Sequence, residues 1–122
     1  MNAKEYYESG RKYFYEDNYD KAIYYFTEVI KLEPGNIKAY YGRGMSYMNK
    51  EKLDLAIADF TEAIRLDNPP TSGHCYFDRA LAYISKGNKA LAISDLEMAV
   101  KIDPQEKDYR ECLEEIKAMI RR

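Results

Sequence analysis

Small and large apolar residues recur along this chain with a period close to 34 residues. Gly10, Gly44 and Ala80 occupy the same position in three successive units, 34 and 36 residues apart. Tyrosines flank them, namely Tyr6, Tyr40 and Tyr76 four residues before and Tyr13, Tyr47 and Tyr83 three residues after. Apolar positions follow at Ala22, Ala56 and Ala92, at Phe26, Phe60 and Leu96, and at Val29, Ala63 and Ala99. Such a period indicates stacked supersecondary units that bury their apolar faces against one another.

The spacings within a unit predict two antiparallel helices. Tyr6, Gly10 and Tyr13 stand at i, i+4 and i+7, which is one helical face, and we expect all six repeating tyrosines to be core residues. Asn18 and Asn88 precede the second apolar set and suit helix N-caps. With a helix for the tail, we predict helices near residues 2–15, 18–32, 36–49, 52–66, 72–86, 88–102 and 106–121.

Two segments depart from the plain repeat. Asn68–Ser72 contains Pro69 and Pro70, so we expect an extended, proline-stiffened connection there. The apolar residues of the tail fall on one helical stripe: Tyr109, Leu113, Ile116 and Ile120. A solenoid exposes its last apolar face, and this stripe predicts a capping helix that covers it. Arg121 and Arg122 suit the C-terminal end of its dipole.

These positions resemble the tetratricopeptide repeat, a helix–turn–helix unit with aromatic, small and alanine residues at set places. When each repeat is counted from Ala3, Ile37 or Gly73, nearly all of these places hold the residue type that the family has there. Val29 and Leu96 are among the departures. The resemblance implies an all-α fold, a right-handed α-solenoid of three repeats closed by a capping helix. It divides a single domain, 1–122, into repeat 1 over 3–36, repeat 2 over 37–70, an insertion at 71–72, repeat 3 over 73–106 and a cap over 106–122.

Composition argues against several classes of function. The 19 basic and 21 acidic residues leave a net charge of −2, without the basic excess of a nucleic-acid binder. No apolar run is long enough to span a membrane, and the first ten residues do not resemble a signal peptide. Cys75 and Cys112 are the only cysteines, which favours a reducing compartment. We therefore expect a cytoplasmic chain with neither a nucleic-acid nor a membrane partner.

No motif for catalysis or for cofactor binding is present. His74 and Cys75 are adjacent, but neighbours on a helix point about 100° apart, so the two side chains do not share a face. No second histidine or ligand-spaced cysteine completes a metal site. We predict no enzyme activity, no cofactor and no metal.

Two charged positions vary together. Position 7 of the repeats holds Ser9, Arg43 and Arg79, and position 23 holds Tyr25, Asp59 and Asp95. Arginine at one accompanies aspartate at the other, which predicts an ion pair between the two helices of repeats 2 and 3. The alternative is that these are unrelated surface charges.

The resemblance also implies a concave groove lined by the first helix of each repeat. Its groove positions carry Lys4, Tyr7, Arg11, Lys38, Tyr41, Met45, His74, Phe77 and Leu81, with Phe14, Met48 and Ile84 at a further position that is partly packing. Tyr7, Tyr41 and Phe77 form a row of aromatic residues suited to anchor a bound segment. We predict a protein-protein interaction module that binds a peptide or helix of a partner. The alternative is a structural self-association module that forms a homo-oligomer.

One class of these repeats clamps the carboxylate tail of chaperones with a set of Lys, Asn and Arg residues. The matching positions here hold Tyr7, Arg11, Gly42, His74 and Asp78. None of them carries the residue that the clamp uses, and Asp78 would repel a carboxylate. We therefore predict that this chain does not bind a Glu-Glu-Val-Asp tail.

Overall fold

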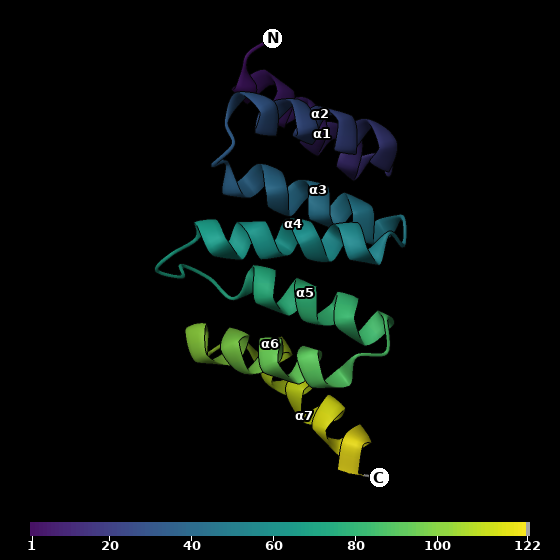
Figure 1. Ribbon diagram of the computed structural model, residues 1–122, viewed down its shortest axis with the longest axis vertical. Helices are drawn as coiled ribbons and strands as arrows, with labels where there is room; N and C mark the ends of the chain where they lie inside the picture. Colours follow the sequence, from purple (N-terminus) through teal and green to yellow (C-terminus); the bar gives the residue numbers. More distant parts are fainter. Residues whose placement is uncertain (122) are drawn as a thin grey trace.

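The chain is helical throughout, apart from its turns, over the residues that the structure describes. The computed structural model describes residues 1–121 and arranges them as seven stacked helices (Figure 1). They are α1 (Ala3–Tyr15), α2 (Tyr19–Leu32), α3 (Ile37–Asn49), α4 (Leu53–Leu66), α5 (His74–Ser85), α6 (Lys89–Ile102) and α7 (Lys107–Arg121). The predicted all-α solenoid is confirmed, and each predicted helix end lies within two residues of the observed one. Residue 122, which the predicted cap includes, lies outside the described residues.

The three helix pairs turn in the same way. The side chains of Asn18 and Asn88 each accept a hydrogen bond of 3.2 Å from a backbone N–H three residues on, which confirms both predicted N-caps. The residue before the second helix's cap has a left-handed backbone in every pair: Asp17 with φ 59°, Glu51 with φ 60° and Gly87 with φ 82°. One such residue reverses the chain and lets the second helix run back along the first.

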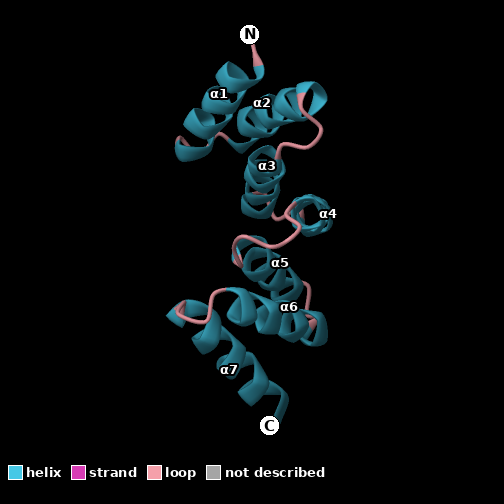
Figure 2. Ribbon diagram, turned by 90° about the vertical axis from the view of Figure 1, so that its left-hand side faces the viewer, coloured by secondary structure: helices cyan, strands magenta, loops and turns pink. Residues whose placement is uncertain are grey.

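The first helices of the pairs form one layer and the second helices form another. α1 contacts α3 and α3 contacts α5, while α2 and α4 each pack between the first helix of their own pair and that of the next. In Figure 2 the first helix lies to the left of the second in both of these pairs, α1 beside α2 and α3 beside α4. α7 packs on α6 and takes the place of a following first helix. The first helices therefore line one face of the solenoid.

Large residues of the second helices fill the interior because the facing residues are small. Phe26, Phe60 and Leu96 are almost inaccessible to solvent. A Cβ atom built on Gly10 would lie 2.8 Å from the ring of Phe26, and one on Gly44 would lie 2.8 Å from the ring of Phe60. Real Cβ atoms do not approach ring atoms so closely, so a larger residue would force the helices apart.

The two predicted ion pairs are confirmed, and both are bidentate. Arg43 donates from Nε and Nη2 to the two carboxylate oxygens of Asp59, each at 2.8 Å. Arg79 does the same to Asp95, at 2.8 and 2.7 Å. The aspartates are buried, with residue exposures of 5% and 4%. These are therefore shielded pairs of fixed geometry rather than loose surface contacts.

Each of these arginines also joins two repeats. Nη1 of Arg43 donates to the hydroxyl of Thr27 in the preceding repeat, at 3.2 Å, and Nη1 of Arg79 donates to Thr61 at 3.0 Å. The guanidinium groups lie over the rings of tyrosines one turn away on the same helix: Tyr40 and Tyr47 for Arg43, and Tyr76 and Tyr83 for Arg79. The hydrogen bond from Nη1 thus ties each paired arginine to the neighbouring repeat.

The first repeat fills the same space with an aromatic ring. Tyr25 stands where the other repeats have aspartate, and its ring stacks on Tyr13 at 5.5 Å and lies 6.2 Å from Tyr6. The six repeating tyrosines are partly buried and none is fully enclosed, so they lie at the edge of the core; Tyr83 packs against the buried cluster of the third repeat. In repeats 2 and 3 they flank a charged guanidinium between two repeats, and that position cannot be sealed like a hydrocarbon core.

The connection between repeats 2 and 3 differs from its prediction. Residues 67–73 contain no helix, as expected, but the segment curls instead of running straight. The carboxylate of Asp67 accepts hydrogen bonds from both the backbone N–H and the hydroxyl of Thr71, each at 3.0 Å. This carboxylate turns the chain back toward the end of α4.

Removal of one partner of the buried pair should strongly destabilise the fold. Asp95→Ala leaves the guanidinium of Arg79 half-buried without its carboxylate, and we expect a loss of about 3–5 kcal/mol in the free energy of unfolding. Urea denaturation of Asp95→Ala, Arg79→Ala and the double variant measures the coupling between the two side chains. Additive losses would show that the pair is not an energetic unit.

The ion pair between Asp20 and Lys50 provides the control. It also joins neighbouring repeats, but the side chain of Asp20 is 80% exposed. Asp20→Ala should therefore cost less than about 1 kcal/mol in the same experiment.

Candidate functional site

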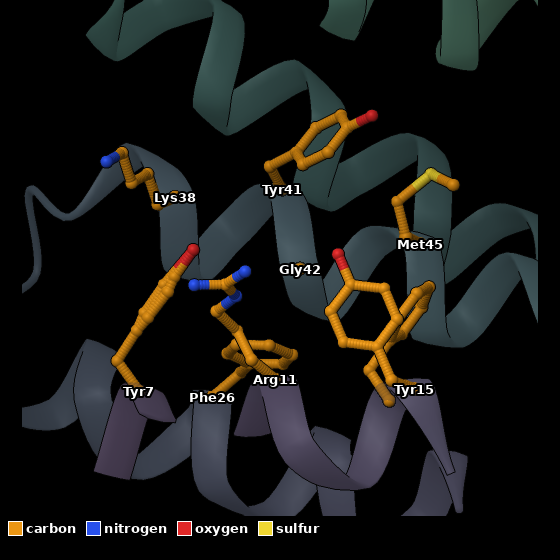
Figure 3. A pocket seen from close by; sticks show the side chains of 9 residues that line it. Tyr7, Arg11, Tyr15, Phe26, Lys38, Tyr41, Gly42 and Met45 are labelled. Atoms are coloured by element: carbon orange, nitrogen blue, oxygen red, sulfur yellow. The ribbon is translucent and has the colours of Figure 1, made fainter. Parts of the chain in front are cut away.

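A pocket opens between α1 and α3 on the layer of first helices (Figure 3). Its volume is about 120 Å³. It is lined by Tyr7, Arg11, Phe14 and Tyr15 of α1, Phe26 of α2, and Lys38, Tyr41, Gly42 and Met45 of α3. In Figure 3 the side chains of Tyr7, Arg11 and Tyr15 reach from α1 toward those of α3. Two successive repeats therefore build the pocket together.

Gly42 lets the ring of Phe26 lie against α3, where the ring forms part of the pocket lining. A Cβ atom at Gly42 would lie 2.6 Å from the ring of Phe26, so only glycine leaves room for this ring between α1 and α3. Asp78 holds the corresponding position in the third repeat, where its side chain is buried. At the junction of α1 and α3 the ring of Phe26 therefore lies against Gly42. At the junction of α3 and α5 the carboxylate of Asp78 stands at the same repeat position as Gly42.

Three cations surround the opening. Lys4, Arg11 and Lys38 line an adjoining hollow of about 360 Å³, together with Glu8 and Glu33. Among the described residues, none of the three cations lies within ion-pair distance of a carboxylate. The guanidinium of Arg11 lies 5.9 Å from the ring centre of Tyr15. The hollow thus carries three cations against two carboxylates, although the whole chain has a net charge of −2.

The hydroxyl of Tyr41 donates a hydrogen bond of 2.6 Å to Oδ2 of Asp78 on the next first helix. Burial, followed by the charge of Asp78, raises the pKa of Tyr41 far above its usual range, so the phenol remains a proton donor. Burial also raises the pKa of Asp78, while this hydrogen bond and His74 act in the opposite direction. The bond holds the ring of Tyr41 between Phe60 and His74, with ring centres at 5.9 and 6.4 Å.

The capping helix engages the third repeat's groove positions. The ring of Phe77 stacks on Tyr109 at 4.7 Å, and Nδ1 of His74 lies 3.1 Å from the hydroxyl of Tyr109. Phe77 packs against the same buried cluster as Leu113 and Ile116. Phe77 therefore packs against the capping helix and does not line the groove hollows that Tyr7 and Tyr41 line.

The structure brings together most of the predicted groove residues. Tyr7, Arg11, Lys38, Tyr41 and His74 share a wider hollow of about 600 Å³, which also contains Asp67, Thr71, Ser72 and Cys75. Met45 belongs to the α1–α3 pocket and Lys4 to the adjoining hollow. Phe77 and Leu81 line none of these three.

Sequence reasoning missed Tyr15, Phe26 and Gly42 as lining residues. The available signal was a second glycine in the helix, two residues before Gly44. Residues of the curled 67–73 connection were missed too, because an extended segment was expected there.

The described residues show little that favours catalysis. Burial, followed by the charges of Asp78 and Asp67, raises the pKa of the Cys75 thiol to about 12, so the thiolate is scarce at neutral pH. Within residues 1–121, no three His, Cys, Asp or Glu side chains are grouped to hold a metal ion. In the same range, every helix is too short or too polar to cross a lipid bilayer. Apolar contact and positive charge are what the site offers.

Solved structures share this fold. The first tetratricopeptide domain of Spaghetti (RPAP3), bound to the HSP90 peptide SRMEEVD, has a TM-score of 0.91 at 24% identity, covering 99% of this chain and 97% of that one. The second such domain of human RPAP3, in complex with the HSP70 peptide SGPTIEEVD, has a TM-score of 0.85 at 27% identity, covering 95% and 98%. The MamA protein has a TM-score of 0.87 at 24% identity, covering 97% and 63%.

Sequence comparison gives the family directly. No curated protein sequence is significantly similar to the chain. Profiles of the tetratricopeptide repeat, however, match residues 3–36, 37–68 and 73–106. With three matched repeats on a solenoid of paired helices, this chain belongs to the tetratricopeptide repeat family.

Proposed function

We propose that this chain is a protein-interaction module that binds a segment of a partner protein across the face formed by α1, α3 and α5. The observation that carries this proposal is the pocket between α1 and α3, where aromatic side chains meet Arg11 and Lys38, two cations without an ion-pair partner among residues 1–121. Similar domains of RPAP3 hold peptides of HSP90 and HSP70 in their solved complexes, which supports a peptide as the ligand here.

Tyr7 and Tyr41 are the proposed anchors of the bound segment. Aromatic residues in a concave site usually contribute most of the binding energy, since they exclude water over a large area. The hydrogen bond to Asp78 fixes Tyr41 before a partner arrives. Less side-chain entropy is then lost on binding, so the site is preorganised.

The proposal also covers the role of the chain and the compartment in which it acts. We assign it an adaptor or scaffold role and not catalysis, because the thiol of Cys75 is a poor nucleophile and Arg11 and Lys38 suit charge recognition. Cys75 and Cys112 are free thiols, which suits the reducing conditions of the cytoplasm.

Selection from a displayed random peptide library tests the proposal. Peptides enriched on the parent chain should lose about 1–2 kcal/mol of binding, or about 5- to 30-fold in Kd, on Tyr7→Ala and on Tyr41→Ala. Fluorescence anisotropy with the labelled peptide measures this loss. Thermal melts monitored by circular dichroism check that both variants remain folded, since Tyr41→Ala also removes the partner of Asp78.

Tyr24→Ala is the matched control, because Tyr24 is a tyrosine 55% exposed on α2, in the other layer. It should bind the peptide like the parent. Equal binding by Tyr7→Ala and Tyr41→Ala would contradict the groove as the site. A change in oligomeric mass on these substitutions, seen by light scattering, would favour self-association instead.

A chaperone tail should not be the ligand. Tyr7, Gly42 and Asp78 stand at positions where the clamp places Lys, Asn and Arg, and Asp78 is a buried carboxylate already bonded to Tyr41. We expect no micromolar binding of a peptide that ends in Glu-Glu-Val-Asp, and no difference between its free acid and its C-terminal amide. The second domain of human RPAP3 is the positive control in the same titration. A Kd at or below about 10 μM that depends on the free carboxylate would refute the prediction.

A further inference from the structure

We infer that the α1–α3 pocket takes one large apolar side chain of the partner segment, and that Arg11 and Lys38 bind an acidic residue next to it. This inference rests on the proposed function and specifies its ligand. The ligand class is an internal protein segment, without the terminal carboxylate that Asp78 would repel, in which an acidic side chain lies beside a leucine, isoleucine, methionine or phenylalanine.

The size of the pocket indicates a single side chain. Its volume is about 120 Å³, and an apolar protein cavity of about 150 Å³ accepts benzene. Phe26 forms its floor, Tyr7 meets Phe26 edge to face at 5.7 Å, and Met45 belongs to the opposite wall. Such walls favour an aliphatic or aromatic group over a polar one, because a polar group would lose its water without a replacement partner.

The charge around the pocket indicates the neighbouring residue. Arg11 and Lys38 both line the pocket, from α1 and α3 respectively, and neither forms an ion pair within the described residues. A guanidinium fork matches a carboxylate, and an ammonium adds a second positive charge beside it. Glu8 and Glu33 line the adjoining hollow, which Arg11 and Lys38 also line, but neither glutamate lines the pocket itself.

The negative charges at the α5 end of the groove indicate that the acidic residue of the partner binds at the α1 end. Asp67 lines the hollow toward α5, and Asp78 is bonded to Tyr41 at the junction of α3 and α5. A partner carboxylate there would meet negative charge and would be repelled. Stacking of Phe77 on Tyr109 leaves the α1–α3 pocket as the better site for an anchor. The acidic residue of the ligand therefore lies toward Lys38 and Arg11.

The same peptide selection tests the inference, with a charge-reversed chain added. Peptides enriched on the parent should carry Asp or Glu within two positions of a large apolar residue. The best peptide, labelled with fluorescein, should lose at least about tenfold in affinity on Arg11→Glu/Lys38→Glu, and equally when its acidic residue becomes Asn or Gln. Its affinity should also fall as salt is raised.

Lys52→Glu/Lys89→Glu is the matched control. Both lysines are exposed at the starts of α4 and α6, where an added carboxylate suits the helix dipole. This variant should bind the peptide like the parent, while carrying the same change in net charge as the groove variant. Equal losses in both variants would mean a general effect of net charge and would overturn the inference.

The outcomes separate the inference from the function on which it rests. Enriched peptides that lack acidic residues yet depend on Tyr7 and Tyr41 would overturn the inference and leave the groove as the site. Enriched peptides whose affinity is unchanged by the substitutions at Tyr7, Tyr41, Arg11 and Lys38 would overturn both the inference and the proposed function. Tighter binding of a labelled single-stranded oligonucleotide than of the best peptide, or no acidic peptide enriched at all, would also overturn the inference.

Discussion

The ring of Phe26, held between two glycines, is the contact on which both the packing and the groove depend. Gly10 allows α1 to approach α2 closely over this ring, and Gly42 allows α3 to approach it from the next repeat. Without either glycine the helices would separate, because a Cβ atom would overlap the ring. The same contact that closes the first hairpin therefore also forms the floor of the pocket between repeats.

The arginine networks place successive repeats so that their first helices share one face. Arg43 and Arg79 each bind an aspartate in their own repeat and a threonine in the repeat before, between two tyrosine rings. The bidentate ion pair fixes each guanidinium within its own repeat, and the hydrogen bond to threonine then favours one register over small slips of one helix pair along the next. That register aligns Tyr7 with Tyr41 across the groove.

The groove has two unlike ends. Between α1 and α3 it is open, aromatic and bordered by cations, whereas toward α5 a carboxylate and the capping helix fill the equivalent space. The difference arises at one repeat position, where Gly42 stands in the second repeat and Asp78 in the third. Repetition thus builds the scaffold, and departures from repetition make the two ends of the groove differ.

Periodic features of the fold could be predicted from the sequence by itself. Helix pairs, N-caps and the Arg43–Asp59 and Arg79–Asp95 pairs repeat with the unit, and each depends on contacts within one or two adjacent helices. Contacts made once could not be predicted: Tyr41 with Asp78, Phe77 with Tyr109, and the curl that Asp67 imposes on Thr71. They join residues in different repeats or in the irregular connection, and no period encodes them. Only the superhelical packing of the repeats decided which groove residues stayed open to a partner and which the protein itself covered.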